Sequence, residues 1–421
     1  MLHRKLIRVC CLLLALGLAG GAASQEKEPL KIGFGMALTG ALAGNGKAAL
    51  IAMQLWEEDV NKHGGMLGRP VKLVYYDDQT NPGTVPGIYS KLLDVDKVDL
   101  IVSGYGTNLI APAMPIVMQR NLTFMTLFGL DVNAKFNYDR FFQIMPAGPD
   151  PAMDWTKGFF DVAMGLKPKP QSIALVGADA EYSAAAVAAA RKHAQALGLK
   201  IVYDRTYPTN TVEFAPIINA IQASKPDLVY VGSYPPDSAG MIRAANEAGL
   251  KTQMFGGGMV GTQYAALRTQ LGPLMNGVVS YEFYVPEAAS KLPNVNDFLV
   301  RYHAHATSAG VDPLGYYLPP YAYAMMQVIE QSVKATNGLD QEKLSSYMHS
   351  HTFDTIVGSV KFGKNGEWAT SRALTVQYRG ITGNGLDQWK KSGNVTILAP
   401  KEYETGTLRA PYQDARAGGP G

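Results

Sequence analysis

The fold is decided by the stretch Lys31-Ile32-Gly33-Phe34-Gly35-Met36-Ala37-Leu38-Thr39-Gly40. It begins as an apolar strand and ends in a loop of small residues, after which a helix carries the chain to Gly64 and Gly65. This glycine pair permits a tight turn into the next strand, at residues 71–76. The order predicts an α/β protein with a loop at the carboxyl end of its sheet, where open α/β sheets bind small molecules.

The same pattern repeats along the chain. Short apolar runs, which we predict to be strands, are residues 100–102, 122–127, 172–176, 201–203 and 226–231. Ala-rich amphipathic segments, which we predict to be helices, are residues 107–120, 183–197, 213–224 and 238–248. This alternation predicts parallel sheets with helices on both faces. Later in the chain, 356–362 and 374–378 alternate polar and apolar residues, as half-exposed antiparallel strands do.

The chain is long enough for two domains with substantial cores. A Pro-rich break at residues 146–151 and the end of a second α/β unit near residue 277 indicate two lobes, with the chain crossing between them more than once. We predict one lobe from residues 29–148 and 279–355, a second lobe from 149–278 and 356–399, and a disordered tail at 400–421.

Residues 1–24 predict a secretory signal peptide. Basic residues come first, Val9 to Leu18 form an apolar run, and small residues from Gly20 to Ser24 offer a cleavage site. An uncleaved membrane anchor is the alternative, but a spanning helix needs roughly twenty apolar residues. We therefore expect export to the periplasm with removal of the leader.

Removing this leader changes the charge balance. The whole chain has 38 Lys and Arg against 35 Asp and Glu, and the leader holds three of the basic residues and no acidic one. The balanced remainder gives no reason to expect binding to nucleic acid. Both cysteines, Cys10 and Cys11, also lie in the leader, which excludes disulfides and thiolate chemistry from the processed chain.

Enzyme and cofactor motifs are missing from the sequence. Gly33 and Gly35 suggest a dinucleotide loop, but Leu38 stands where the third glycine of that motif is required. The pairs His303/His305 and His349/His351 have a spacing that points to different helix faces, so we expect exposed histidines and no metal site. We expect neither a cofactor nor catalysis, and a secreted Rossmann-fold enzyme is a remote alternative.

Hydroxyl and aromatic side chains stand at the predicted strand-to-helix loops. Thr107 or Asn108, close behind Tyr105, is predicted to cap the next helix, and its free N–H groups could hold an anion. The other loops carry Phe128-Gly129, Tyr182, Tyr234 and Tyr317. Any one tyrosine is more often half-buried packing, but four at equivalent sheet ends favour an aromatic-walled cleft.

Five motifs, in their order and spacing, resemble the leucine/isoleucine/valine-binding group of type I periplasmic binding proteins, which serve ABC importers. They are Gly33-x-x-x-Ala37-Leu38-Thr39-Gly40, Asn61-Lys62-His63-Gly64-Gly65, Val74-Tyr75-Tyr76-Asp77-Asp78, Asn81-Pro82 and Ala245-Asn246-Glu247-Ala248-Gly249-Leu250. The resemblance implies two Rossmann-like lobes that close over one solute by hinge motion. It also implies three crossovers, near residues 145–150, 278–282 and 356–358.

The resemblance also implies roles for particular residues. Thr107 would grip a solute carboxylate, and Phe128-Gly129 would add backbone groups. The remaining matching positions are Tyr182 and Tyr234 on the closing lobe, Tyr317 over the solute side chain and Asn45 in the first loop. Amino-acid binders place an acid against the solute ammonium, whereas Gly258 stands at that position here. A glycine there implies room for a larger or flatter solute.

We therefore expect the solute-binding component of an ABC importer, with permease and ATPase subunits as partners and a monomeric state. A desolvated ammonium without an anion is costly, so we expect a carboxylate without an α-amino group, either aromatic or branched aliphatic. A branched-chain or other hydrophobic amino acid is the alternative.

Overall fold

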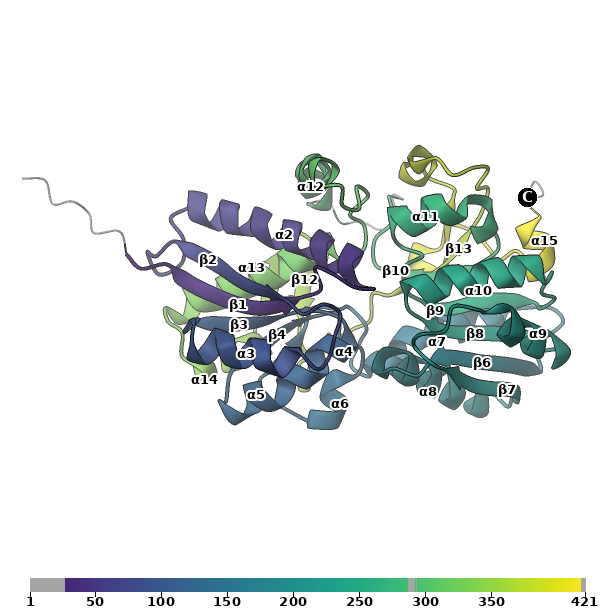
Figure 1. Cartoon of the computed structure of the whole chain (residues 1–421), viewed down its shortest axis with the longest axis horizontal. Coiled ribbons are helices and arrows are strands. Elements are labelled where there is room, and N and C mark those ends of the chain that lie inside the picture. Colours follow the sequence, from purple (N-terminus) through teal and green to yellow (C-terminus); the bar gives the residue numbers. More distant parts are fainter. Residues whose placement is uncertain (1–26, 287–291, 293, 418–421) are drawn as a thin grey trace, which may run out of the picture.

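The computed structural model describes residues 27–286, 292 and 294–417, so the predicted signal peptide at 1–24 lies outside the described residues. Two α/β lobes, each built on its own sheet, lie side by side (Figure 1). The expected fold class, α/β with parallel sheets covered by helices, is confirmed.

Lobe 1 contains a parallel sheet of five strands in the order β2-β1-β3-β4-β5. The strands are β1 (Leu30–Met36), β2 (Val71–Asp77), β3 (Leu100–Tyr105), β4 (Phe124–Leu127) and β5 (Phe141–Gln143). Its helices are α2 (Ala43–Lys62), α3 (Val85–Asp94), α4 (Thr107–Ile110), η1 (Ala111–Ala113), α5 (Met114–Gln119), α6 (Val132–Phe136), α12 (Val295–Ala309), α13 (Pro319–Thr336) and α14 (Gln341–Ser350). Helix α13 packs on α2, where the Trp56 indole donates to Glu330 at 2.9 Å.

Lobe 2 contains a sheet of seven strands in the order β14-β13-β10-β9-β8-β6-β7. The strands are β6 (Ser172–Ala178), β7 (Lys200–Tyr207), β8 (Leu228–Ser233), β9 (Met254–Met259), β10 (Val279–Glu282), β13 (Leu374–Tyr378) and β14 (Val395–Ala399). Only β13 and β14 join this sheet in antiparallel pairs. The helices are α7 (Pro151–Ala163), α8 (Glu181–Ala196), α9 (Ala215–Ala223), α10 (Pro235–Glu247), α11 (Ala265–Leu271), η2 (Gly272–Met275), η4 (Leu386–Lys390), η5 (Lys401–Tyr403) and α15 (Tyr412–Arg416).

The crossings between the lobes differ from the expected positions at two of three places. Strand β10 belongs to the sheet of lobe 2, because Val279 pairs with Gly256 of β9, so the second crossing follows Glu282. The hairpin of β11 (Thr352–Thr355) and β12 (Gly358–Lys361) still packs on α13, so the third crossing follows Lys361. The lobe boundaries predicted at 279 and 356 therefore fall several residues early.

The first and third crossings run beside each other. The Gln143 amide donates to the Gly366 carbonyl, and the Arg372 amide donates to the Pro146 carbonyl, both at 2.9 Å. Two adjacent peptide strands are therefore bonded to one another where the lobes meet.

The carboxyl-terminal part differs from the sequence prediction. All five residues of β13 are buried rather than half-exposed, because the polar Gln377 donates to carbonyls of Gly277 and Arg409. The segment predicted as a disordered tail carries η5 and α15 up to residue 417. Tyr412 is buried there, and its ring packs against Phe255 at 5.0 Å.

Candidate ligand-binding cleft

A cavity lies between the two lobes, and its walls are mostly aromatic and aliphatic. The lining residues are Leu42, Tyr105, Gly106, Thr107, Phe128, Leu130, Met145, Trp155, Tyr182, Tyr234, Val260, Tyr281 and Tyr317. The space left between them is about 20 Å³, enough for roughly one water molecule. Two wider grooves of about 620 and 670 Å³ also lie between the lobes. A solute of benzoate size therefore needs the lobes to separate before it can reach the cavity.

The sheet topology explains why residues so far apart in sequence meet here. Tyr105 is the last residue of β3, and Phe128 follows β4 with a positive φ of 50°. Tyr182 lies in the first turn of α8, and Tyr234 immediately precedes α10. All four positions are at the carboxyl ends of parallel strands, where open α/β sheets form their binding crevice.

The rings pack edge to face across the cavity. Trp155 lies 5.8 Å from Tyr182 and 4.6 Å from Tyr281, measured between ring centroids. On the other side, Phe128 lies 5.3 Å from Tyr317. Such pairs are favourable beyond the area they bury, so the walls have a defined shape.

The described residues that line the cavity carry no charged group at neutral pH. None of its lining residues is Asp, Glu, Lys, Arg or His. Burial raises the pKa of the Tyr182, Tyr281 and Tyr317 phenols well above the ordinary value of 10, so these hydroxyls stay neutral. A solute in this cavity therefore meets hydrogen-bond donors and aromatic surface, and no counter-ion.

Thr107 is the aliphatic hydroxyl that lobe 1 contributes to the cavity lining, beside the phenols of Tyr105 and Tyr317. It does not cap the helix as predicted, because Gly106 is the residue before α4 and no side-chain cap bond forms. The predicted helix at 107–120 is instead divided into α4, η1 and α5, with Pro112 in the middle. The Thr107 oxygen accepts the Leu130 amide at 3.0 Å, which leaves its own hydrogen available for a solute oxygen.

Gly258 lies within β9, and the room expected beside it is filled. The Tyr182 hydroxyl donates to the Gly258 carbonyl at 2.9 Å. A Cβ added at Gly258 would lie 2.9 Å from both the Trp155 ring and the Tyr182 oxygen. Aromatic side chains therefore take the space that the sequence led us to expect for the solute.

The other predicted site residues fall into two groups. Those that line the cavity are Tyr105, Thr107, Phe128, Tyr182, Tyr234 and Tyr317. Asn45 and Asn108 instead line one flanking groove each, and Gly129 faces Gln143, whose side-chain amide donates to the Gly129 carbonyl at 2.6 Å. Direct contact of any of these residues with a solute stays a prediction.

The sequence reasoning missed several lining residues, of which Trp155 and Tyr281 are the largest. Trp155 stands in α7, four residues past the Pro that begins this helix, and Tyr281 stands in β10 at a crossing between lobes. Each follows or precedes a chain crossing. Their positions as large aromatic residues next to predicted crossings were therefore the sequence signal that could have identified them as lining residues.

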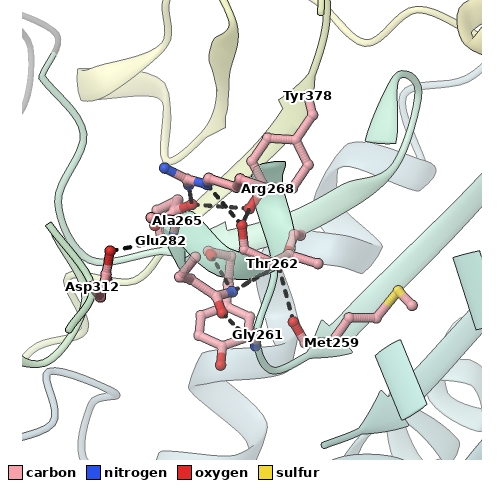
Figure 2. Close-up of polar contacts among 11 residues, drawn as sticks. Met259, Gly261, Thr262, Ala265, Arg268, Glu282, Asp312 and Tyr378 are labelled. Carbon is pink, nitrogen blue, oxygen red and sulfur yellow. Dashed lines mark hydrogen bonds and ion pairs between the residues drawn. The ribbon is translucent and has the colours of Figure 1, made fainter. Parts of the chain in front are cut away.

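Lobe 2 contains a buried ion pair, one partner of which directly follows Tyr281 of the cavity lining (Figure 2). Arg268 of α11 donates to Glu282 of β10 at 2.5 Å, and both side chains are almost fully buried. The Tyr378 hydroxyl donates to the same Glu282 oxygen at 2.9 Å. From the loop between α12 and α13 of lobe 1, Asp312 accepts the Ala265 amide at 3.3 Å, which links the lobes.

The described residues contain neither a metal-binding cluster nor a membrane-spanning helix. No group of three or more His, Cys, Asp or Glu residues that could hold a metal ion occurs in this part of the chain. Within the same residues, no helix combines the length and apolar character that crossing a bilayer requires.

Comparison with known proteins identifies the family. Residues 29–383 match the periplasmic binding protein family, to which the chain therefore belongs, as the motifs had indicated. An amino acid binding protein of Pseudomonas aeruginosa is 24% identical over 378 residues, covering 90% of this chain and 97% of that protein. A leucine-, isoleucine-, valine-, threonine- and alanine-binding protein of the same organism is 23% identical, covering 86% and 93%.

Solved structures show the same fold. A solute-binding protein of an ABC transporter from R. palustris, crystallised in complex with benzoate, superposes with a TM-score of 0.72 at 18% identity. The match covers 88% of this chain and 96% of that chain. The type I periplasmic binding protein fold predicted from the sequence is confirmed.

Proposed function

We propose that this protein is the solute-binding component of an ABC importer and that it captures a small aromatic carboxylate between its lobes. The observation that carries the proposal is the neutral aromatic cavity, in which none of the lining residues is an acid that could meet an ammonium group. Transfer of an unpaired ammonium into such surroundings is costly. A carboxylate, in contrast, can accept the free hydrogen of Thr107.

The proposal includes the cellular setting. The leader at residues 1–24 would direct export and be removed, leaving a monomeric protein in the periplasm. Closing of the lobes over the solute would create the surface that a membrane permease and its ATPase subunits recognise. The protein would carry out no chemical step.

A branched-chain or other hydrophobic amino acid is the second candidate. It is favoured by the names of the two Pseudomonas aeruginosa relatives, both of which are amino-acid binders. In this case a backbone carbonyl would have to meet the ammonium.

A thermal-shift screen of the leaderless protein, refolded after denaturation, separates the candidates. It compares leucine, isoleucine and phenylalanine with benzoate, 4-hydroxybenzoate and short branched fatty acids. A ligand at a hundredfold its dissociation constant stabilises the fold by about 2.7 kcal/mol, which is readily visible. Shifts with aromatic acids alone support the proposal, and a shift with leucine alone contradicts it in favour of the second candidate.

A further inference from the structure

The polar groups around the cavity divide into those with partners and those without. Tyr182 donates to Gly258, and the hydroxyls of Tyr281 and Tyr317 bond to each other at 3.1 Å. The indole N–H of Trp155 and the hydroxyl of Tyr234 are buried, and no acceptor among the described residues takes the hydrogen of either group.

The chemistry of these two groups restricts what could satisfy them. An indole N–H can only donate, so it requires an acceptor. The Tyr281 ring, whose centroid lies 4.6 Å from that of Trp155, could offer no more than the weak acceptor of a π system. A buried donor without a partner destabilises the folded protein, and a suitably placed acceptor on a solute would remove this cost.

The two groups also share a position in the fold. Trp155 lies on α7 and Tyr234 precedes α10, so both belong to lobe 2, whereas Thr107 belongs to lobe 1. A solute that bonds to donors of both lobes would join them. A solute with only one polar end would leave the donors of one lobe unsatisfied.

Building on the proposed function, we infer that the solute carries a second hydrogen-bond acceptor at the end of its ring remote from the carboxylate, and that Trp155 and Tyr234 select for it. Hydroxyl, alkoxy and carbonyl oxygens satisfy this requirement. An ammonium group does not, because it cannot accept a hydrogen bond.

Calorimetric titration of the leaderless protein with 4-hydroxybenzoate and 4-methylbenzoate tests the inference. The two acids have substituents of similar size, but only the hydroxyl can accept. We expect 4-hydroxybenzoate to bind about tenfold more tightly. In Trp155→Phe this preference should fall below about threefold, with little change in the affinity for 4-methylbenzoate, and Tyr234→Phe should reduce the preference as well.

Trp389→Phe is the matched control. The Trp389 indole N–H is also buried without a partner, but this residue does not line the cavity. The control should keep the full preference. Equal affinities for the two acids in the unmodified protein, or a preference that survives Trp155→Phe, would overturn the inference while leaving the proposed function intact.

A spectroscopic measurement on the unmodified protein covers the case in which Trp155→Phe does not fold. The chain has four tryptophans, so ¹⁵N labelling gives few indole signals, which single substitutions assign. The Trp155 N–H signal should move further with 4-hydroxybenzoate than with 4-methylbenzoate, and the Trp389 signal should not move. An unmoved Trp155 signal overturns the inference, whereas no binding of any aromatic acid overturns the proposed function as well.

Discussion

The two lobes build the same cavity by different means. Lobe 1 contributes Thr107, whose oxygen is tied to the Leu130 amide, and Phe128 at a left-handed turn position. Lobe 2 contributes further rings, above all Trp155 of α7, and holds the buried pair of Arg268 and Glu282. Both lobes supply aromatic walls, and lobe 1 adds a hydroxyl whose oxygen is fixed by a backbone amide, which we expect to anchor the solute.

The largest expected change is a loss of stability when the ion pair of lobe 2 is broken. Glu282→Ala would leave the Arg268 guanidinium buried without its counter-ion, although the Thr262 carbonyl still accepts from it, which should lower the free energy of unfolding by about 3–5 kcal/mol. Urea denaturation measures the change. The paired replacement Arg268→Met with Glu282→Leu removes both charges and should recover most of the loss. A loss below about 1 kcal/mol in Glu282→Ala would mean that water reaches the guanidinium.

The packing of lobe 2 around Gly258 should tolerate no added methyl group. Gly258→Ala places a Cβ 2.9 Å from Trp155 and from the Tyr182 oxygen, so overpacking should cost about 1–3 kcal/mol and weaken solute binding. Gly383→Ala is the control, because nothing lies within 4 Å of a Cβ there. Equal stability of the two variants would show that the rings move aside freely.

The anchor of lobe 1 should respond differently. Thr107→Ala removes a donor to the solute and should weaken an aromatic carboxylate at least tenfold, or about 1.4 kcal/mol. It also leaves the Leu130 amide without an acceptor, so some stability is lost too. Thr107→Ser keeps the hydroxyl and should retain most of the affinity, measured by titration, and most of the stability, measured by thermal unfolding. Unchanged affinity in Thr107→Ala would remove this residue from the site.

The last expected effect, a gradual dependence of stability on pH, is one that the lobes share. Burial raises the pKa of Asp78 in lobe 1 and Asp237 in lobe 2 to about 6, well above the ordinary value of an aspartate. The folded protein therefore keeps protons that the unfolded chain releases between pH 4 and about 6, so raising the pH through this window lowers stability. A rise of about two pKa units corresponds to at most about 3 kcal/mol for each group, spread over the whole of this pH window.

The variants Asp78→Asn and Asp237→Asn isolate these contributions. Urea unfolding from pH 4 to about 7 should show a smaller fall in stability for each variant than for the unmodified protein. Carboxyl groups common to all three proteins cancel in that difference. A variant whose stability falls as much as that of the unmodified protein would contradict the raised pKa of the aspartate that it replaces.

Much of the fold could be predicted because strand and helix periods are local properties. The strands at 100–105 and 228–233 and the helices that follow them depend on runs of neighbouring residues. The burial of β13 could not be predicted in this way, because Gln377 finds its acceptors on Gly277, 100 residues earlier, and on Arg409, 32 residues later. The alternation of polar and apolar residues is the same in a half-exposed strand and in a buried strand whose polar side chains find partners.

The candidate site likewise contains some residues that local patterns predict and others that they do not. Residues at strand ends, such as Tyr105 and Tyr234, follow from the topology alone. Trp155 reaches the cavity from a helix whose orientation depends on the crossing between lobes, which no local pattern encodes. The filling of the space beside Gly258 depends on Trp155 and Tyr182 together and is likewise a property of the assembled lobes.

The paired crossings give the molecule a mechanical property. Bending about the bonds from Gln143 to Gly366 and from Arg372 to Pro146 preserves them, whereas sliding one lobe past the other breaks them. A Cβ at Gly366 would lie 1.7 Å from the Phe141 carbonyl oxygen, so only glycine allows the two chains to run this close. We therefore expect the lobes to move with one degree of freedom, so that a single angle distinguishes the open from the closed form for any partner at the membrane.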